Sequence, residues 1–217
     1  MKKNKFNEDY YERGQQLGIS GYTDYRWLPE LTIPMCRSIV KYLEIKEKDL
    51  LLDFGCAKGF IVKGFNDLGY NCFGTDISQY AISKSPSDIR NKIIMFSGYE
   101  SIEKILSYSG KDKFDFIISK DVFEHIEYSE IESIVSVLSR YCNALFVVVP
   151  LALNQQYVVT EYEGDVTHII REDMHWWLSL FIRNGFRVCE AKHQVKGIKE
   201  NWSHYPKGNG FFSLNTY

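Results

Sequence analysis

Residues 50–59 read LLLDFGCAKG, and this stretch decides the fold. Its first five residues form a short apolar run, which is typical of a strand buried on both faces of a parallel sheet. Gly55 ends the run, and a helix is expected to begin at Gly59. Glycines at these two positions allow the backbone to approach a ligand closely. The stretch therefore predicts a strand, a ligand-binding loop and a helix in succession.

The same alternation continues along the chain. The pattern predicts strands at 71–75, 92–96, 114–118, 143–149 and 186–195, a last strand near Phe211, and helices at 29–44, 59–68, 78–84, 100–108, 128–140 and 171–184. Such alternation is typical of a doubly wound α/β fold, in which helices cover both faces of a parallel sheet. Ligands of such sheets bind beyond the carboxyl ends of the strands. The residues that follow each strand are therefore the candidate site.

Composition narrows the class of protein. The chain has 217 residues, of which 45% are hydrophobic and 25% charged, as expected for one folded domain with a small appendage. A net charge of -2 provides no strong basic field, so we expect no nucleic-acid partner. The longest apolar run, 144–153, is too short for a membrane span, and no signal peptide is expected. Five scattered cysteines without a Cys-x-x-Cys pair favour a reducing compartment, so we expect a cytoplasmic protein.

Two further predicted strands are followed by polar residues that could bind a ligand. Asp76 follows the second strand, and an acid at this position can accept hydrogen bonds from both hydroxyls of a ribose. Residues 119–126 follow the fourth strand and read SKDVFEHI. Because the carboxyl ends of parallel strands share one edge of the sheet, we expect these residues to lie near the glycine loop.

These motifs resemble those of class I S-adenosylmethionine-dependent methyltransferases. Residues 53–59 resemble the first motif of that family, Asp76 its ribose-binding acid, and residues 114–126 its fourth-strand motif. Residues 165–186 resemble the stretch before its sixth strand. The resemblance covers residues 50–195. It implies an α/β, doubly wound, Rossmann-like sheet of seven strands, mostly parallel with a C-terminal antiparallel hairpin, and methyl transfer from S-adenosylmethionine, which becomes S-adenosylhomocysteine.

The resemblance also implies a cofactor site made of the residues that follow the first four strands, together with two residues of the N-terminal segment. They are Asp53, Phe54, Gly55, Cys56, Ala57, Gly59, Asp76, Ile77, Ser78, Gly98, Tyr99, Lys120, Asp121, Val122, Tyr25 and Arg26. Ala57 stands where the family often has glycine, and the loop should tolerate it if its φ is negative. Residues 96–99 lack the acid that commonly holds the adenine amino group, so a hydroxyl or backbone group is expected to do so.

We divide the chain into an N-terminal helical cap or lid at 1–45 and a cofactor-binding domain at 46–217. The aromatic rings of the first segment could attract the sulfonium of the cofactor, and Arg26 could pair with its carboxylate. A simple helical cap without such contacts remains open.

Three residues are the catalytic candidates. His125 would act as general base because a histidine pKa of ~6.5 lies near working pH, and Glu124 precedes it in the sequence. His168 could be a second acid or base, or could contact the acceptor; otherwise it is a hydrogen-bonded residue of a polar loop. The alternative is that Glu124 and His125 only stabilise the loop after the fourth strand. We expect no metal. A divalent ion such as zinc or manganese bound by Asp121, Glu124, His125 and His168 remains the alternative.

The acceptor is predicted by a second resemblance. Residues 25–31, YRWLPEL, are similar to a segment of methyltransferases from bacterial surface-polysaccharide clusters. This implies a small-molecule acceptor, namely an oxygen of a sugar, phosphate or phosphoramidate in a capsule precursor. A quinone-like phenol, an RNA end, a protein acceptor and a silent cofactor-binding partner subunit remain alternatives. A nicotinamide dehydrogenase is disfavoured because Ala57 and Lys58 interrupt the Gly-x-Gly-x-x-Gly motif.

Overall fold

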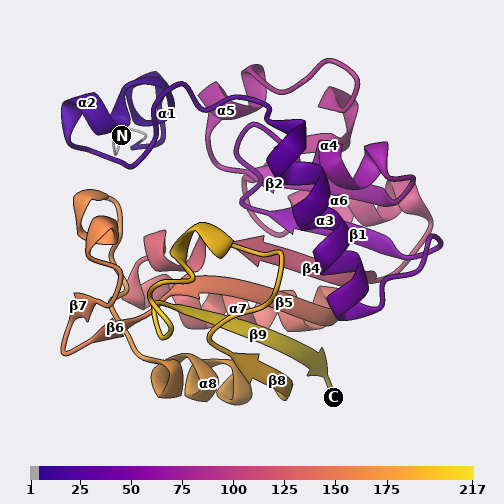
Figure 1. Cartoon of the computed structure of the whole chain (residues 1–217). Helices are drawn as coiled ribbons and strands as arrows, with labels where there is room; N and C mark the ends of the chain where they lie inside the picture. Colours follow the sequence, from indigo (N-terminus) through magenta and orange to yellow (C-terminus); the bar gives the residue numbers. More distant parts are fainter. Residues whose placement is uncertain (1–4) are drawn as a thin grey trace.

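The computed structural model describes residues 5–217, and its centre is one seven-stranded sheet (Figure 1). The order of its strands is β3-β2-β1-β4-β5-β9-β8. The strands are β1 (Leu50–Phe54), β2 (Asn71–Asp76), β3 (Ile93–Met95), β4 (Phe114–Lys120), β5 (Cys142–Pro150), β8 (Phe186–Lys192) and β9 (Asn209–Thr216). The first five pair in parallel, β9 pairs antiparallel with β5, and β8 pairs antiparallel with β9. The predicted doubly wound sheet with its C-terminal antiparallel hairpin is confirmed.

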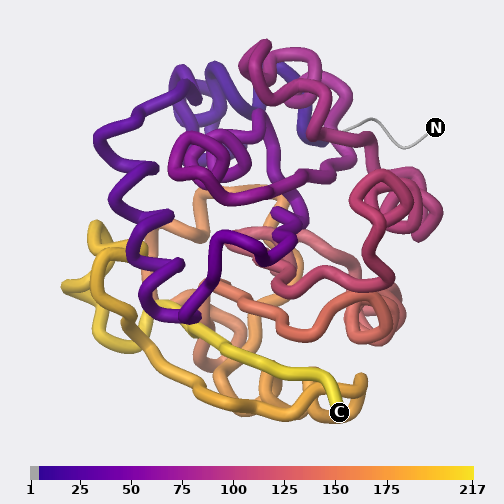
Figure 2. Tube along the Cα trace, turned by 90° about the vertical axis from the view of Figure 1, so that its right-hand side faces the viewer, coloured from indigo at the N-terminus to yellow at the C-terminus, as the bar shows by residue number. Residues whose placement is uncertain are grey.

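Helices cover both faces of the sheet (Figures 1 and 2). On one face lie α3 (Pro29–Leu43) and α4 (Phe60–Asp67), and on the other α6 (Glu100–Ser109), α7 (Tyr128–Tyr141) and α8 (Met174–Arg183). In β1, Leu51 packs with the first pair, whereas Leu50 and Leu52 pack with the second group. Both faces of β1 are therefore buried, which explains why its sequence is a continuous apolar run.

The predicted elements agree with the structure within a few residues. The helix expected at 171–184 begins later, at Met174, because the side chain of Asp173 accepts a hydrogen bond from the backbone N–H of Trp176 and caps it. Several short elements were not predicted because they are too short to show a period. They are α1 (Glu8–Glu12), α2 (Gly14–Leu17), the hairpin β6 (Ala152–Leu153) and β7 (Gln156–Tyr157), and the 3-10 turns η1 (Arg90–Lys92), η2 (Phe123–His125), η3 (Thr160–Gly164) and η4 (Glu200–Trp202). The short α5 (Gln79–Ser83) falls within the predicted 78–84.

Residues 5–28, here called the N-terminal cover, lie beside the carboxyl ends of the parallel strands (Figure 1). The hydroxyl of Ser78 donates to the carbonyl oxygen of Phe6 at 2.6 Å, which fixes the cover to the end of β2. The Lys58 ammonium donates to the carbonyl oxygen of Tyr25 at 2.5 Å, which fixes it to the glycine loop. In contrast, α3 packs against α4 within the main core. The division of the chain at residue 45 stays a proposal.

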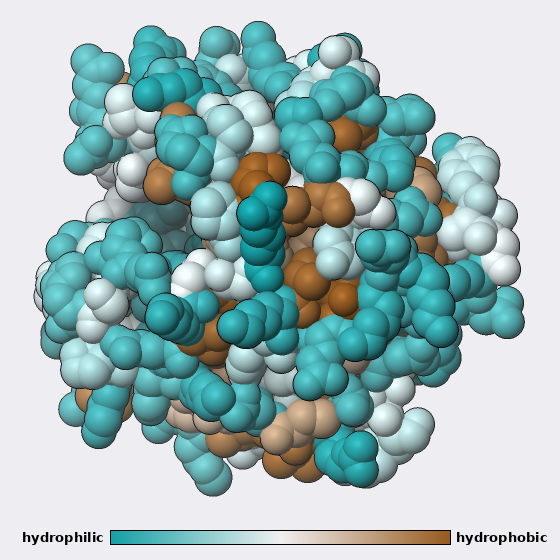
Figure 3. All heavy atoms as spheres, turned by 45° about the vertical axis from the view of Figure 1, so that its right-hand side comes forward, coloured by the Kyte–Doolittle hydropathy of each residue, from teal (hydrophilic) through white to brown (hydrophobic). Residues whose placement is uncertain are grey.

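The surface seen in Figure 3 is mostly hydrophilic, and a few apolar side chains show near the middle of this face. Among residues 5–217, no helix has the length and hydropathy that a membrane-spanning segment requires.

Candidate active site

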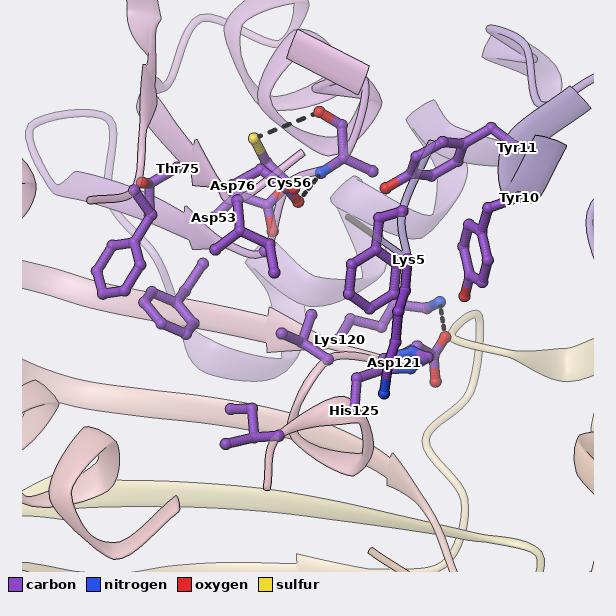
Figure 4. Close-up of a pocket in the computed structure, with 18 of the residues that line it drawn as sticks. Lys5, Tyr10, Tyr11, Asp53, Cys56, Thr75, Asp76, Lys120, Asp121 and His125 are labelled. Carbon is purple, nitrogen blue, oxygen red and sulfur yellow. Dashed lines mark hydrogen bonds and ion pairs between the residues drawn. The ribbon is translucent and has the colours of Figure 1, made fainter. Parts of the chain in front are cut away.

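A cavity of about 660 Å³ lies at the carboxyl ends of β1, β2 and β4, beneath the N-terminal cover (Figure 4). The order of the strands reverses between β1 and β4, and this is where doubly wound sheets bind their ligands. Three groups of residues form the wall: the ends of the strands, the first turns after β4, and the cover. They are Asp53, Phe54, Gly55, Cys56, Ala57, Ile61, Thr75, Asp76, Ile77, Phe96, Lys120, Asp121, Val122, His125, Ile126, Glu127, Glu130 and Ile134, with Lys5, Phe6, Tyr10, Tyr11, Tyr22 and Tyr25 of the cover.

The two glycines of the loop after β1 are required by their surroundings. Gly55 has a φ of +82°, and a Cβ there would lie 2.5 Å from Cγ2 of Val122. Gly59 has a φ of +79°, and a Cβ there would lie 2.2 Å from Cδ1 of Ile93. A side chain at either position would be strained by the backbone conformation and would have to displace a neighbouring side chain. The two glycines therefore let the loop pack closely against Val122 and Ile93, and Gly55 also lines the cavity.

Ala57 does not meet the condition stated for an unstrained alanine at this position. That condition was a negative φ, and its φ is +49°. The backbone N–H of Ala57 donates to Oδ2 of Asp76 at 2.7 Å, and this hydrogen bond is made with the loop in its left-handed conformation. A left-handed non-glycine residue costs ~1–2 kcal/mol. The loop therefore contains local strain at the position where the family often has glycine.

Asp76 joins the loops that follow β1 and β2. Its two carboxylate oxygens accept the backbone N–H groups of Ala57 and Ser78, both at 2.7 Å. Burial raises the pKa of Asp76, and these backbone donors oppose the rise. Because a carboxylate has about four acceptor positions, positions remain for hydroxyl donors of a ligand in the cavity.

Asp53 is the neighbouring buried acid, and only 2% of it is exposed. Its Oδ2 has no hydrogen-bond partner among the residues that the structure describes. Burial, helped by the charge of Asp76, raises the pKa of Asp53 to about 8. A buried carboxyl with one unpaired oxygen at the wall of a cavity is suited to a cationic group of a ligand, which would restore its charged form.

The cover adds aromatic rings to the cavity. The rings of Tyr11 and Tyr25 stack with centroids 5.8 Å apart, and the rings of Tyr22 and Tyr25 lie 4.7 Å apart. Aromatic faces attract cations within about 6 Å. Arg26, by contrast, pairs with Asp24 at 2.5 Å and lies outside the cavity wall.

His125 lines the cavity immediately after β4, in η2. Its Nδ1 lies 2.8 Å from the hydroxyl oxygen of Thr167, and the edge of its ring packs against Phe6 with centroids 5.3 Å apart. Burial, with the nearby His168, lowers the pKa of His125 to about 4. The expectation of a pKa near 6.5 is therefore wrong, because a buried imidazole loses the hydration that stabilises its charge. His125 is neutral at pH 7.

Glu124 and His168 lie behind His125, outside the cavity wall. The rings of His168 and His125 have centroids 4.7 Å apart. Glu124 is 1% exposed, and its Oε2 has no hydrogen-bond partner among the described residues. Burial raises the pKa of Glu124 well above its usual value, which favours the neutral carboxylic acid.

Three of the four residues in the alternative metal set come together. Glu124, His125 and His168 place potential ligand atoms within 4.8 Å of one another. Asp121 is instead held by the ammonium groups of Lys120 and Lys199. Burial would raise the pKa of Asp121, but these two lysines outweigh it and hold the pKa below its usual value. A metal site would therefore have to form without Asp121.

The family is decided by comparison with known proteins. The model of the methyltransferase domain family matches residues 30–194. The chain belongs to the methyltransferase domain family. No curated protein matches the chain significantly.

Solved structures share the fold of this methyltransferase. An S-adenosylmethionine-dependent methyltransferase from Archaeoglobus fulgidus has a TM-score of 0.64 and 14% identity, covering 87% of this chain and 95% of that chain. A TehB-like methyltransferase from Corynebacterium glutamicum has a TM-score of 0.59 and 15% identity, covering 85% and 88%. Magnesium protoporphyrin IX methyltransferase from Synechocystis, solved with S-adenosylmethionine bound, has a TM-score of 0.56 and 12% identity, covering 99% and 90%. The predicted class I methyltransferase fold is confirmed.

Most residues predicted for the site of this methyltransferase line its cavity. Those that do are Asp53, Phe54, Gly55, Cys56, Ala57, Asp76, Ile77, Lys120, Asp121, Val122, His125 and Tyr25. Gly59, Ser78, Gly98, Tyr99, Arg26, Glu124 and His168 lie outside the wall. Gly59 and Ser78 still support it, through the turn after β1 and the hydrogen bond to Asp76. Tyr99 instead contacts Ser133 on α7.

Several residues of the wall were not among the predicted site residues. They are Lys5, Phe6, Tyr10, Tyr11, Tyr22, Ile61, Thr75, Phe96, Ile126, Glu127, Glu130 and Ile134. Four of them, from Ile126 to Ile134, follow the predicted Glu-His pair within nine residues. Their position after the fourth strand could have indicated that they line the cavity. Phe96 follows the third strand in the same way. The aromatic residues of the cover were expected near the cofactor only as a group, and Lys5 carries no comparable signal.

Proposed function

We propose that this methyltransferase binds S-adenosylmethionine in the cavity and methylates an oxygen atom of a small molecule. The observation that carries the proposal is the pair of buried acids, Asp53 and Asp76, which face one cavity from the ends of adjacent strands beside Gly55. When bound, S-adenosylmethionine supplies a methyl group activated by a positively charged sulfur. Its ammonium and its ribose hydroxyls are the groups that an unpaired carboxyl and a carboxylate with free acceptor positions would bind.

Each part of the wall has a distinct role in this proposal. Asp76 accepts from the ribose hydroxyls, and Asp53 binds the ammonium. The apolar side chains of Phe54, Phe96 and Val122 suit the adenine base. The tyrosine rings of the cover suit the sulfonium. Holding the two reactants in line supplies most of the rate of such a transfer, since intramolecular cases gain roughly 7–11 kcal/mol.

His125 is the proposed general base. An acceptor hydroxyl must lose its proton as the new bond forms, and His125 is a neutral imidazole at the cavity wall. Its low pKa makes it a weak base, so it would act late, when the hydroxyl oxygen has already gained positive character. An acceptor that is already a carboxylate or phosphate oxygen would need no base, and His125 would then orient it.

For the acceptor, we favour a sugar, phosphate or phosphoramidate of a capsule or surface-polysaccharide precursor in a bacterial cytoplasm. The support is the similarity of residues 25–31 noted above, and the presence of Lys5 at the cavity wall, which suits an anionic acceptor. The cavity volume falls within the usual range of ~300–1,000 Å³ for small-molecule sites. A second candidate is a quinone-like phenol, which the aromatic wall of Phe6, Tyr10 and Tyr22 favours.

Calorimetric titration tests the proposal. The protein is titrated with S-adenosylmethionine, with S-adenosylhomocysteine and with NAD, and the Asp53→Asn variant is compared with Glu47→Gln, which changes an exposed acid far from the cavity. We expect both sulfur ligands to bind, NAD to give no heat, and Asp53→Asn alone to weaken binding by at least tenfold. Absence of binding by both sulfur ligands would contradict the proposed cofactor, and NAD binding would favour a dehydrogenase.

A further inference from the structure

The loop beneath His125 contains a chain of hydrogen bonds that determines where the protons lie. The hydroxyl oxygen of Thr167 is 2.6 Å from Oδ1 of Asp165 and 2.8 Å from Nδ1 of His125. A carboxylate can only accept, and a hydroxyl has one proton to donate. The Thr167 proton therefore lies toward Asp165, which leaves the Thr167 oxygen to accept from His125.

This assignment fixes the tautomer of the neutral His125 ring. If Thr167 accepts from Nδ1, that nitrogen carries the ring proton, and the lone pair lies on Nε2. The opposite arrangement would turn the Thr167 oxygen toward the carboxylate of Asp165 without a proton between them, at a distance of 2.6 Å. The groups whose charges reach His125 are His168, Asp165 and Asp121.

Asp165 is held from two sides. Its Oδ1 also accepts the backbone N–H of Thr167 at 2.9 Å, and its Oδ2 accepts the hydroxyl of Tyr10 at 2.8 Å. The loop after it is fixed to η2, because the carbonyl oxygen of Glu124 accepts the backbone N–H groups of Ile169 and Ile170 at 2.7 and 3.0 Å. The carboxylate therefore has little freedom to turn away from Thr167.

We propose that Thr167 and Asp165 are positioning residues for His125. They hold its ring with the proton on Nδ1 and the lone pair on Nε2, ready to accept a proton from the acceptor hydroxyl. The hydroxyl of Tyr10, in the N-terminal cover, holds Asp165 in place. The role in catalysis rests on the proposed function of His125, whereas the tautomer itself is a property of this chain that needs no acceptor.

Nuclear magnetic resonance of the histidine rings tests the proposal directly. Long-range proton–nitrogen spectra at pH 7 distinguish a ring nitrogen that carries a proton from one with a lone pair, and loss of signals in His125→Asn assigns them. We expect His125 as a single tautomer with its proton on Nδ1. His168 is an internal reference, since its Nδ1 lies 3.1 Å from the carbonyl oxygen of Tyr162 and must donate. A His125 proton on Nε2 in the wild-type protein would overturn the proposal without any variant.

Matched variants test the two positioning residues. Thr167→Val removes the hydroxyl at similar volume and should convert His125 to a mixture of tautomers, whereas Thr167→Ser should restore the single tautomer. Asp165→Asn should also lose the single tautomer of His125, because an amide can donate to the hydroxyl oxygen of Thr167. A single Nδ1–H tautomer in folded Thr167→Val and Asp165→Asn would overturn the assigned roles. Calorimetry with S-adenosylmethionine on the same samples separates this result from the proposed function. Absence of binding by the wild-type protein would contradict the proposed cofactor but would not change the tautomer result.

Discussion

The hydroxyl of Tyr10 donates to Oδ2 of Asp165 at 2.8 Å, and this buried hydrogen bond joins residues 155 positions apart. It connects the N-terminal cover with the loop beneath His125. The cover also contacts the loop after β1, where Lys58 donates to Glu12 at 2.5 Å. The cover therefore connects the loop after β1 with the loop that contains Asp165 and Thr167.

We expect Tyr10→Phe to lower the free energy of unfolding by about 1.5–3 kcal/mol, the range for hydrogen bonds to charged groups, because it leaves a buried carboxylate oxygen without its donor. Urea denaturation followed by circular dichroism measures the change. Tyr108→Phe is the matched control, since Tyr108 is 67% exposed and should cost little. Equal stability of the two variants would contradict the assigned contact.

Ala57→Gly should stabilise the protein by about 1 kcal/mol, because glycine relieves the left-handed strain at this position. The same exchange in a helix, Ala81→Gly, should have the opposite sign, since a glycine in a helix interior costs roughly 1 kcal/mol and Ala81 is buried. Thermal denaturation of both variants checks the signs. Destabilisation by Ala57→Gly would show that the loop is not strained as described.

Gly55→Ala should weaken S-adenosylmethionine binding by at least tenfold while the fold is retained, because the added Cβ would push Val122 in the cavity wall. Gly164→Ala is the control, since no atom lies near a Cβ built there. Calorimetry measures affinity, and circular dichroism checks the fold. Wild-type affinity in Gly55→Ala would mean that this loop does not contact the cofactor.

Stability should depend on pH through His125. Its pKa falls from 6.5 to about 4 on folding, so the folded protein favours the neutral ring. The resulting stability is present above pH 6.5 and is lost as the pH falls toward 4. At 1.36 kcal/mol per pH unit this amounts to about 3 kcal/mol. Urea midpoints from pH 7 to pH 4 should therefore fall less steeply for His125→Gln than for wild type, whereas the exposed control His175→Gln should follow the wild type.

We expect no metal ion to be needed at Glu124, His125 and His168. Protein dialysed against a chelator should keep its melting temperature and its affinity for S-adenosylmethionine. Added manganese or zinc should raise the melting temperature no more in the wild type than in His168→Asn. A rise confined to the wild type would support the metal alternative instead.

The sequence by itself determined the sheet, the glycine loop and the positions of Asp53, Asp76 and His125. These depend on local patterns: apolar runs predict buried strands, and glycines and acids at the ends of strands predict the edge where a ligand binds. The parallel order of the strands then brings those ends together. The local sequence left the sign of the φ of Ala57 open, and it also does not show the hydrogen bond from the backbone N–H of Ala57 to Asp76, 19 residues away.

Only the tertiary structure decided which groups surround His125. Thr167 lies 42 residues from it and Lys199 lies 78 residues from Asp121, and contacts at such separations leave no period in the sequence. Burial, which lowers the pKa of His125 and raises that of Asp53, exists only once the chain is packed. The sequence thus determined which residues reach the cavity from the strands, whereas packing decided their protonation and their partners.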